Sequence, residues 1–256
     1  DRSFLDHMLH KHAEALDHVV SAYTSDVEHH LPIHPEYAAS ILDEVASHDA
    51  IFTVDTGMNN VWAARYITPN GRRRVIGSFR HGSMANALPH AIGAQLAYPG
   101  REVISMSGDG GLGMLLGELL TVGMYQLPVK IVVFNNAALG MVKLEMLVDG
   151  LPDSETDNGG FDYAAIARAV GIHAIRVEQP TDVPAALSEA LARRGPALVD
   201  LVTDPDALSI PPHITAEQVR GFALGAGKVV LDGGVGKMVE LARANLRNIP
   251  RPAITR

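Results

Sequence analysis

The sequence has 256 residues, of which 47% are hydrophobic and 20% charged, with a formal net charge of −8 and no cysteine. This composition is typical of a globular protein and fits one large domain with short additions. The absence of cysteine excludes disulfide bonds, thiolate metal sites and cysteine nucleophiles. The negative charge argues against a nucleic-acid partner, and no apolar run approaches the ~18 residues that a membrane span needs.

The first segment, residues 1–31, is polar, helical in pattern and rich in histidine. We expect a linker helix here, because Pro32 and Pro35 then mark a boundary. The chain begins at Asp1 without a basic-then-apolar leader, so we expect no signal peptide and place the segment inside a longer protein. The histidine groups lack acidic or cysteine partners at ligand spacing, which favours a structural or solvated state over a metal site; they are His7, His10 and His12, and His29, His30 and His34.

Short β-branched segments then alternate with helical ones, which predicts a doubly wound α/β domain over residues 32–205. Its parallel sheet would be covered by helices on both faces, and ligands bind such sheets at the carboxyl ends of the strands. The pattern loosens after Pro211–Pro212 into glycine-rich sequence over 221–236, so residues 206–256 are expected to be a tail with one last short helix. The expected helices are 34–48, 85–97, 113–126, 161–170 and 181–194, and the expected strands are 50–55, 102–107, 128–134, 173–178 and 196–203.

A glycine-rich turn, Gly108–Asp109–Gly110–Gly111, joins the strand 102–107 directly to a helix. Such a turn exposes backbone N–H groups that suit a phosphate. The spacing of Gly108, Gly110 and Gly113 also satisfies the dinucleotide fingerprint, which leaves that interpretation open. A dinucleotide site, however, needs an acidic residue ~20 positions on, at the end of the next strand. Here that strand ends in Asn135–Asn136.

A divalent cation between Asp109 and the phosphates explains more of these residues. Asp109 follows one strand, and Asn136 with a backbone carbonyl follows its neighbour. Hard oxygen ligands of this kind, completed by diphosphate oxygens and water, form the octahedron that Mg²⁺ requires. The sequence therefore predicts a magnesium–diphosphate site at this edge of the sheet.

These residues also carry a family resemblance. Gly108–Asp109–Gly110 followed by Asn135–Asn136 resembles the thiamine-diphosphate signature of decarboxylases, oxidases and acetolactate synthases. The segment DTGMNNVWA (55–63) resembles the first diphosphate-contacting loop of these enzymes, and GSFRHGSMANALP (77–89) resembles the loop that cradles the aminopyrimidine. Together with LPVKIVVFNN (127–136) and IPPHI (210–214), they are most similar to bacterial pyruvate:quinone oxidoreductases.

The resemblance implies a role for each site residue. Asp109, Asn136 and the Ala138 carbonyl would bind Mg²⁺. Met84 would sit between the two cofactor rings, although a methionine in such a segment is also an ordinary core residue. The Gly82 carbonyl and the Met84 N–H would contact the pyrimidine. The other cofactor-binding residues implied are Thr56, Gly57, Met58, Asn59, Ser83, Gly108, Gly110, Gly111, Leu139, Gly140 and Met141.

The stretch after the asparagine pair is expected to close over the substrate or contact a flavin. It contains Met141, Val142 and Glu145, and Glu145 is equally interpretable as a solvated helix residue. His81, beside the pyrimidine segment, has either a part in the active site or a structural role.

The activity implied is the oxidative decarboxylation of pyruvate to acetate and CO₂, with electrons passed through FAD to a membrane quinone. The activating glutamate and the flavin would come from N-terminal and flavin domains, in a homotetramer at the cytoplasmic face of the membrane. Residues 236–247 (GKMVELARANLR) place apolar side chains on one side of a helix and basic ones on the other, which suits contact with anionic lipid. The same pattern also suits a helix packed on its own domain.

Two alternatives stay open. The chain resembles other enzymes of the same cofactor family, such as acetolactate synthase or a 2-oxo acid decarboxylase. From a different class, it could be a non-catalytic nucleotide-binding module. Such a module would keep a glycine turn but would need neither the pair Asp109 and Asn136 nor Met84.

Overall fold

A six-stranded, entirely parallel sheet forms the centre of the protein in the computed structural model, which describes residues 2–24, 30–208, 216–231 and 235–245. The strand order is β2-β1-β3-β4-β6-β5, so each connection crosses over through helical or loop segments. The α/β prediction is confirmed. The strands are β1 (Ile51–Val54), β2 (Arg74–Gly77), β3 (Val103–Gly108), β4 (Lys130–Asn135), β5 (His173–Val177) and β6 (Ala197–Val202).

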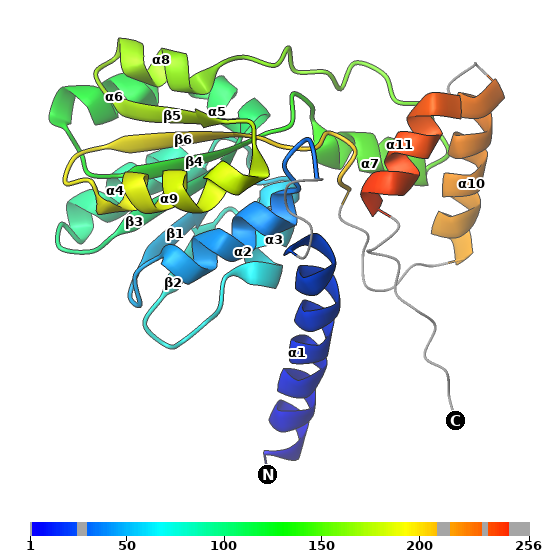
Figure 1. Ribbon diagram of the computed structural model, residues 1–256, viewed down its shortest axis with the longest axis horizontal. Coiled ribbons are helices and arrows are strands. Elements are labelled where there is room, and N and C mark those ends of the chain that lie inside the picture. Colours follow the sequence, from blue (N-terminus) through cyan, green and yellow to red (C-terminus); the bar gives the residue numbers. More distant parts are fainter. Residues whose placement is uncertain (1, 25–29, 209–215, 232–234, 246–256) are drawn as a thin grey trace.

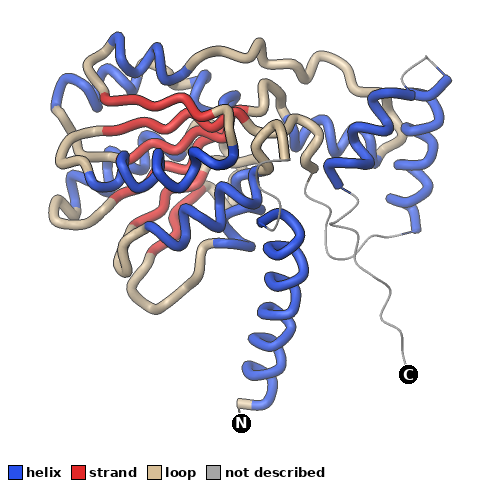
Figure 2. Tube along the Cα trace, viewed as in Figure 1, coloured by secondary structure: helices blue, strands red, loops and turns tan. Residues whose placement is uncertain are grey.

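Helices cover both faces of the sheet (Figures 1 and 2). One layer contains α2 (Pro35–Val45), α3 (Met58–Tyr66) and α9 (Val183–Ala192), and the other contains α4 (Ala87–Ala97), α6 (Glu118–Tyr125) and α8 (Tyr163–Ala169). Because successive strand residues point to opposite faces, Phe52 packs in the first layer and Ile51 in the second. Strands buried on both faces explain the continuous apolar runs of the sequence.

Three elements differ from the sequence prediction. The edge strand β2 was not predicted, because its four residues are mostly exposed and carry no strong apolar pattern. The helix α3 begins inside the segment 55–63 that resembles a diphosphate-contacting loop and continues to Tyr66. The predicted helix 113–126 is two helices, α5 (Asp109–Met114) and α6, and the first of these begins inside the glycine turn.

The C-terminal part is more regular than predicted. A helix, α10 (Ala216–Leu231), occupies much of the segment expected to be loose, so that expectation was wrong. Its glycines are not linker residues: Gly221 and Gly225 lie where α10 contacts α7 (Gly140–Val148), and a methyl group at Gly221 would be 1.7 Å from the Val148 carbonyl oxygen. The predicted last helix corresponds to α11 (Val235–Asn245), while residues 210–214 and 246–247 lie outside the described residues.

The first helix, α1 (Ser3–Thr24), extends away from the sheet (Figure 1). It lies within the predicted linker helix 1–31, of which residues 25–29, including His29, are outside the described part. Among the described residues, no helix combines the length and apolarity needed to cross a bilayer.

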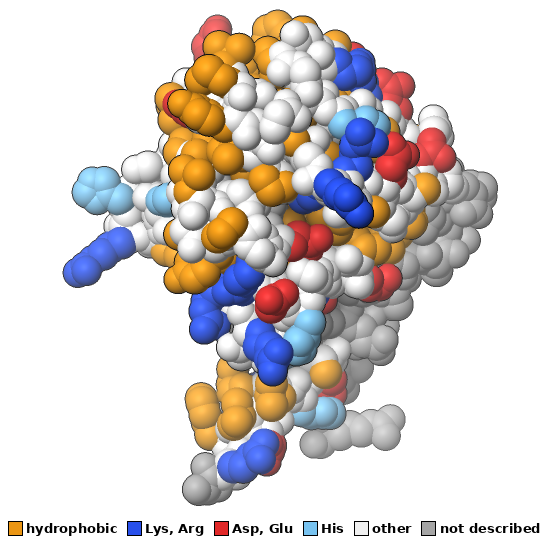
Figure 3. Space-filling model, turned by 90° about the vertical axis from the view of Figure 1, so that its left-hand side faces the viewer, with side chains coloured by type: hydrophobic (Ala, Val, Ile, Leu, Met, Phe, Trp, Pro, Cys, Tyr) orange, Lys and Arg blue, Asp and Glu red, His pale blue; other side chains and the backbone are white. Residues whose placement is uncertain are grey.

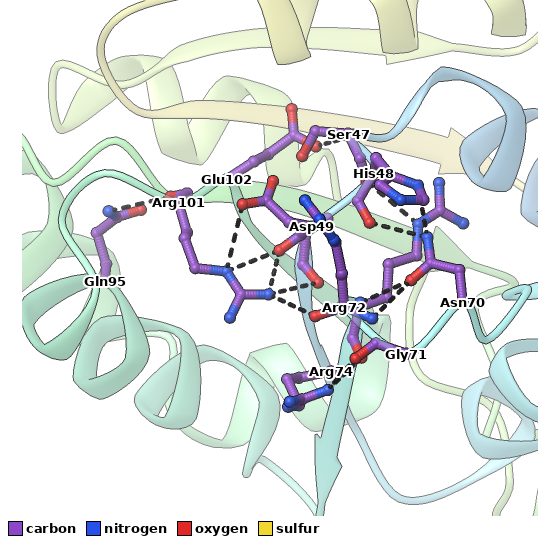
Figure 4. Close-up of polar contacts among 12 residues, drawn as sticks. Ser47, His48, Asp49, Asn70, Gly71, Arg72, Arg74, Gln95, Arg101 and Glu102 are labelled. Carbon is purple, nitrogen blue, oxygen red and sulfur yellow. Dashed lines mark hydrogen bonds and ion pairs between the residues drawn. The ribbon is translucent and has the colours of Figure 1, made fainter.

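The amino-terminal edge of the sheet is closed by polar contacts (Figure 4). The Arg101 guanidinium donates to the carbonyls of Asp49 and Arg72, with Nε 2.7 Å from the Asp49 oxygen and Nη2 3.0 Å from that of Arg72. The Ser47 N–H donates to the Glu102 carboxylate at 2.8 Å. These contacts tie loops together at this edge, and a cavity of about 270 Å³ lies at the opposite one.

Candidate functional site

A cavity of about 270 Å³ lies at the carboxyl ends of β1, β3 and β4. It brings together residues from six separate segments of the sequence, at 35, 56–62, 82–84, 108–111, 134–145 and 203–207. Of the residues predicted from the sequence, those that line it are Thr56, Gly57, Met58, Asn59, Gly82, Met84, Gly108, Asp109, Gly110, Gly111, Asn136, Ala138, Leu139, Gly140, Met141, Val142 and Glu145. Ser83 is the predicted residue that does not line it; this residue is exposed, and its N–H donates to Ser78 Oγ.

The glycine turn needs glycine because its neighbours approach closely. A methyl group at Gly110 would lie 2.7 Å from Leu139 Cδ2, and one at Gly111 would lie 1.7 Å from Asp55 Oδ2. The absence of side chains leaves the backbone of the turn facing the cavity. An anionic group could therefore reach its N–H groups directly.

Asp109 begins α5 and is almost fully buried at 2% exposure. Burial raises the pKa of its carboxyl above the ordinary value, and hydrogen bonds from the Asn158 side chain and from the backbone of Gly110 and Asn136 offset part of that rise. Asn158 Nδ2 donates to Asp109 Oδ2 at 3.0 Å. The Asp109 carboxyl and the Asn136 backbone are thus neighbours, as the parallel strand ends require.

The loop after β4 is held in an unusual conformation. Ala137 has a positive φ of 54°, and the Ala138 N–H donates to Asn136 Oδ1 at 3.1 Å. The loop that contains Asn158 runs beside it, with the Asn158 N–H 2.7 Å from the Ala137 carbonyl oxygen and the Leu139 N–H 2.8 Å from that of Thr156. Strained backbone that is fixed from several sides is common at functional sites.

The two asparagines of the pair have different roles. Asn135, the last residue of β4, turns away from the cavity and donates through Nδ2 to Asp200 Oδ1 and to the Phe161 carbonyl, each at 2.9 Å. Asn136 lines the cavity. Asp200 is fully buried and also accepts from the Tyr163 N–H at 3.0 Å and from Arg176 Nη1 at 2.7 Å. Asn135 therefore anchors the strand end from which Asn136 projects.

The loop after β1 provides a second set of backbone groups. Gly57 has a φ of 132°, which side-chain-bearing residues rarely adopt. The Thr56 hydroxyl is buried, lines this cavity and has no hydrogen-bond partner within the described part of the chain. Buried polar atoms are nearly always satisfied, so this hydroxyl fits a site whose ligand supplies the partner.

Met84 contacts the cavity from the segment before α4. Its Cε would lie 3.7 Å from a methyl group at Gly110, so the side chain reaches over the glycine turn. Gly82 has a φ of 67° and its N–H donates to the Ser78 carbonyl at 2.7 Å. His81 is exposed and does not line the cavity.

The helix α7 closes one side of the cavity. Met141, Val142 and the exposed Glu145 face it, while Lys143 and Leu147 on the same helix are buried. Lys143 Nζ is 2.7 Å from Asp206 Oδ1, which fixes α7 to the segment after β6.

Several residues at this site were given no role of their own from the sequence, although Asp55 and Trp62 belong to the segment 55–63 that resembles a diphosphate-contacting loop. Trp62 and Asp204 also line the cavity, and Asp55 and Asn158 lie behind it. Asp204 follows β6, so the rule for strand ends could have indicated it. Burial raises the pKa of its carboxyl, with the Asp206 N–H offsetting part of the effect. Asn158 lies in a loop without periodicity, and its sequence carries no comparable signal.

The donors at the cavity fit a hard cation. Among the described residues, no group of three histidine, cysteine, aspartate or glutamate side chains is placed to hold a metal. A site here would instead combine one carboxylate, one amide oxygen and a carbonyl. Oxygen sets completed by a ligand's phosphates suit Mg²⁺, which keeps several non-protein ligands.

Comparison with known proteins identifies the family. The model of the thiamine pyrophosphate enzyme C-terminal, thiamine-pyrophosphate-binding domain matches residues 55–201. The chain belongs to this family. The match begins at Asp55 and ends at Leu201, so it includes the glycine turn, the asparagine pair and the Met84 segment.

Three relatives match between 66% and 87% of the chain. "Putative thiamine pyrophosphate-containing protein YdaP" of Bacillus subtilis is 35% identical over 87% of the chain and 38% of its own length. "Probable acetolactate synthase large subunit" of Methanococcus aeolicus is 37% identical over 71% and 32%, and "Acetolactate synthase 2, chloroplastic" of Zea mays is 36% identical over 66% and 28%. The chain thus spans about a third of the length of these relatives. These three relatives support membership of the thiamine-pyrophosphate enzyme family. None of the three is named a pyruvate:quinone oxidoreductase.

Proposed function

We propose that this domain binds its thiamine diphosphate through Mg²⁺ and forms the cofactor site of an enzyme that acts on a 2-oxo acid such as pyruvate. The observation that carries the proposal is one cavity in which Asp109 and Asn136, at the ends of β3 and β4, meet the glycine turn. A nucleotide-binding module would not need this pair of oxygen donors.

The residues around the cavity divide into three tasks. The Asp109 carboxylate, the Asn136 side-chain oxygen and the Ala138 carbonyl would hold Mg²⁺, and N–H groups of the glycine turn and the Thr56 loop would hold the diphosphate. Met84, reaching over Gly110, would hold the two rings close together. When bound, the cofactor would supply a carbon nucleophile for the ketone of a 2-oxo acid and a thiazolium ring as the sink for the electrons left by departing CO₂. The chain's own residues bind and orient it.

Acetolactate synthesis is the reaction that the named relatives favour. Two of the three relatives are named acetolactate synthases, at 36–37% identity over 66–71% of the chain. In that reaction class the fragment left after decarboxylation is transferred to a second 2-oxo acid.

Oxidation of pyruvate, with electrons passed through FAD to a quinone, is the second candidate. It is supported by the segments GSFRHGSMANALP and LPVKIVVFNN, which resemble the quinone-reducing enzymes. The Bacillus subtilis relative, which matches 87% of the chain, has a name that specifies the cofactor but no reaction. FAD would have to be bound by another domain.

A broad apolar surface supports a partner domain or subunit. Large hydrophobic side chains are exposed on α4, α5 and α6 and the turns between them, and Figure 3 shows hydrophobic atoms gathered on that side of the molecule. Contiguous exposed apolar surface usually marks an interface. We propose that further domains, including the one with the activating glutamate, dock here in a homotetramer. The exposed residues include Leu96, Tyr98, Met114, Leu115, Leu120, Met124 and Tyr125.

Contact of the C-terminal segment with the inner face of the membrane is a further proposal. The packing of α11 on the domain determines which of its residues could meet a bilayer. Leu241 is buried against Leu147 and Leu208, and Lys237 Nζ is 3.1 Å from Asp153 Oδ2. A bilayer would therefore meet Val235 and Val239, which are exposed, or α11 would have to leave the domain. Deleting residues 236–256 and measuring co-sedimentation with anionic vesicles tests this. Undiminished binding would contradict it.

A titration tests the cofactor site. Trp62 is the one tryptophan of the sequence and lines the cavity, so its fluorescence should respond to the ligand. We expect thiamine diphosphate to change this fluorescence only when Mg²⁺ is present. Asp109→Ala should abolish the response while the circular dichroism spectrum stays unchanged, and Asp49→Ala, at the far edge of the sheet, should leave it intact. Mg²⁺-dependent binding by Asp109→Ala would contradict the ligand assignment.

Product analysis separates the two reactions. The full-length protein would be incubated with pyruvate, thiamine diphosphate and Mg²⁺, with and without FAD and a quinone analogue. Acetolactate formed without an electron acceptor supports the first candidate, and acetate formed only with the acceptor supports the second. The 256-residue chain alone is expected to catalyse neither reaction of pyruvate, because the resemblance places the activating glutamate in another domain.

A further inference from the structure

A buried carboxylate to which the resemblance assigns no role lies directly behind the cavity. Asp55 follows β1 and is 1% exposed, and burial raises the pKa of its carboxyl above the ordinary value. It does not line the cavity, so it is not placed to bind a ligand. Burying a carboxylate is costly unless hydrogen bonds compensate.

The compensating hydrogen bonds come mainly from the segment that carries Met84. Asp55 Oδ1 accepts from the Asn86 N–H and from Asn86 Nδ2, each at 3.1 Å, and from the Thr56 N–H at 3.0 Å. Asn86 Nδ2 also donates to the Ser83 carbonyl at 2.8 Å. One amide group therefore joins Asp55 to both ends of the short segment that contains Met84.

The segment between these anchors has an unfavourable backbone. Ala85 has a φ of 63°, a left-handed conformation that is disfavoured for residues with a side chain. It is buried, so the conformation cannot be relieved by moving into solvent. Such strain persists only where the surroundings impose it. The hydrogen bonds of Asn86, one residue on, are the restraint that the structure offers.

We propose that Asp55 and Asn86 are positioning residues that together hold Met84 over the glycine turn and thereby set the affinity for the ring part of thiamine diphosphate. The proposal rests on the proposed cofactor site. Met84 and Asn86 lie on either side of Ala85, so a change in φ at Ala85 would turn the methionine away from Gly110. Asp55 acts from behind, because its second oxygen occupies the space beside Gly111.

The test compares two ligands by calorimetry in the full chain. In the proposed site, Mg²⁺–thiamine diphosphate would contact both the diphosphate loops and the Met84 segment, whereas Mg²⁺ with inorganic diphosphate would contact only the diphosphate loops. We expect Asn86→Ala to weaken the binding of thiamine diphosphate by about tenfold or more, which is the scale of a lost hydrogen bond to a charged acceptor. The binding of inorganic diphosphate should weaken by less than about threefold. Asn86→Ser, which keeps one donor, should fall between the wild type and Asn86→Ala.

A double variant tests whether Asn86 acts through Met84. Positions that act through one another have non-additive effects. Met84→Ala and Met84→Ala/Asn86→Ala should therefore bind thiamine diphosphate equally weakly. Glu102→Ala is the matched control, because this carboxylate also accepts a backbone N–H, from Ser47, but at the opposite edge of the sheet (Figure 4).

The outcomes are distinguishable. Equal weakening of both ligands by Asn86→Ala, additive losses in the double variant, or unchanged affinity would each overturn the positioning role. If the wild-type chain binds Mg²⁺–diphosphate but not the thiamine form, the proposed function fails instead. If Asn86→Ala does not fold, Asn86→Ser decides. Asp55→Asn, which keeps the Oδ1 acceptor, is the conservative variant that should bind within about threefold of the wild type.

Discussion

The hydroxyl of Tyr163 donates a hydrogen bond of 2.8 Å to the backbone carbonyl of Asp109. Tyr163 begins α8, which is 54 residues further along the chain, and its N–H donates to the buried Asp200. Burial, with smaller contributions from the charges of Asp109 and Asp200, raises the pKa of Tyr163 to about 12. The hydroxyl therefore stays a donor at all physiological pH values, and it fixes the backbone from which the Asp109 carboxylate projects.

Tyr163→Phe removes this hydrogen bond without changing the packing of the ring. We expect the free energy of unfolding to fall by about 1 kcal/mol and Mg²⁺-dependent binding of thiamine diphosphate to weaken by about threefold to tenfold. Urea denaturation and Trp62 fluorescence measure the two effects. Tyr125→Phe is the control, because Tyr125 is exposed on α6, and it should change neither quantity. Loss of stability with unchanged Mg²⁺ dependence would show that the bond does not position Asp109.

Asp109→Asn should stabilise the protein without ligands while abolishing Mg²⁺-dependent binding. Burial raises the folded-state pKa of Asp109 above its unfolded value, so ionised Asp109 destabilises the fold at neutral pH. This cost is relieved as the pH falls through the folded-state pKa, where Mg²⁺ binding is lost too. A neutral amide avoids the cost at every pH.

The measurement for Asp109→Asn is thermal unfolding at pH 7, with and without Mg²⁺–thiamine diphosphate. The variant should unfold at a higher temperature than the wild type when both are free of ligand. Added ligand should not raise the unfolding temperature of the variant further. Asp49→Asn, whose side chain is about half exposed, should match the wild type in both conditions. A less stable Asp109→Asn protein would mean that the carboxylate contributes more through its hydrogen bonds than it loses by burial.

The sequence predicts much of the fold because its central strands are buried on both faces. The runs at 128–134 and 196–203 are continuous and β-branched, and they correspond closely to β4 and β6. The edge strand β2 escapes prediction because it has little to bury. In α10, glycine composition suggested loose structure, whereas Gly221 and Gly225 allow two helices to touch. Composition alone cannot distinguish a glycine that gives flexibility from one that permits close packing.

At the site, the sequence predicts best the residues that follow strands. Asp109 and Asn136 are adjacent to strand ends, so parallel topology brings them to one edge. Asp55 also follows a strand, but its partner Asn86 and the strained Ala85 become meaningful only through three-dimensional contacts. Asn158 reaches Asp109 from a loop 49 residues away, and no local pattern indicates such a contact.

Gly111→Ala should be strongly destabilising. The added methyl group would lie 1.7 Å from Asp55 Oδ2, and Asp55 is held in place by Thr56 and Asn86. We expect the free energy of unfolding to fall by about 3 kcal/mol, the upper end of the usual range for overpacking. Gly117→Ala is the control, since no atom would lie within 4 Å of its methyl group. It should leave urea stability unchanged or raise it by about 0.4–1 kcal/mol. Equal effects of the two variants would show that Asp55 can move aside.

The contact between α10 and α7 also depends on glycine. A methyl group at Gly221 would lie 1.7 Å from the Val148 carbonyl oxygen, and one at Gly225 would lie 3.0 Å from that of Leu147. Lys228 Nζ donates to the Gly150 carbonyl at 2.9 Å, next to the same contact. Because the opposite side of α7 lines the cavity through Met141 and Glu145, displacement of α10 would reach the cofactor site.

Gly221→Ala should therefore separate α10 from α7 and weaken cofactor binding without unfolding the sheet. Backbone atoms cannot yield as a flexible side chain can, so we expect a cost of about 1–3 kcal/mol for the docked state. Gly227→Ala is the matched control on the same helix, since its methyl group would meet no atom within 4 Å, and it should favour the helix by about 1 kcal/mol. Hydrogen exchange at α7 and α10, together with calorimetry of Mg²⁺–thiamine diphosphate, measures both effects. Faster exchange of α7 with unchanged cofactor affinity would show that α10 covers α7 without supporting the cavity. Unchanged hydrogen exchange in both helices would show that small shifts accommodate the methyl group and that α10 stays packed on α7.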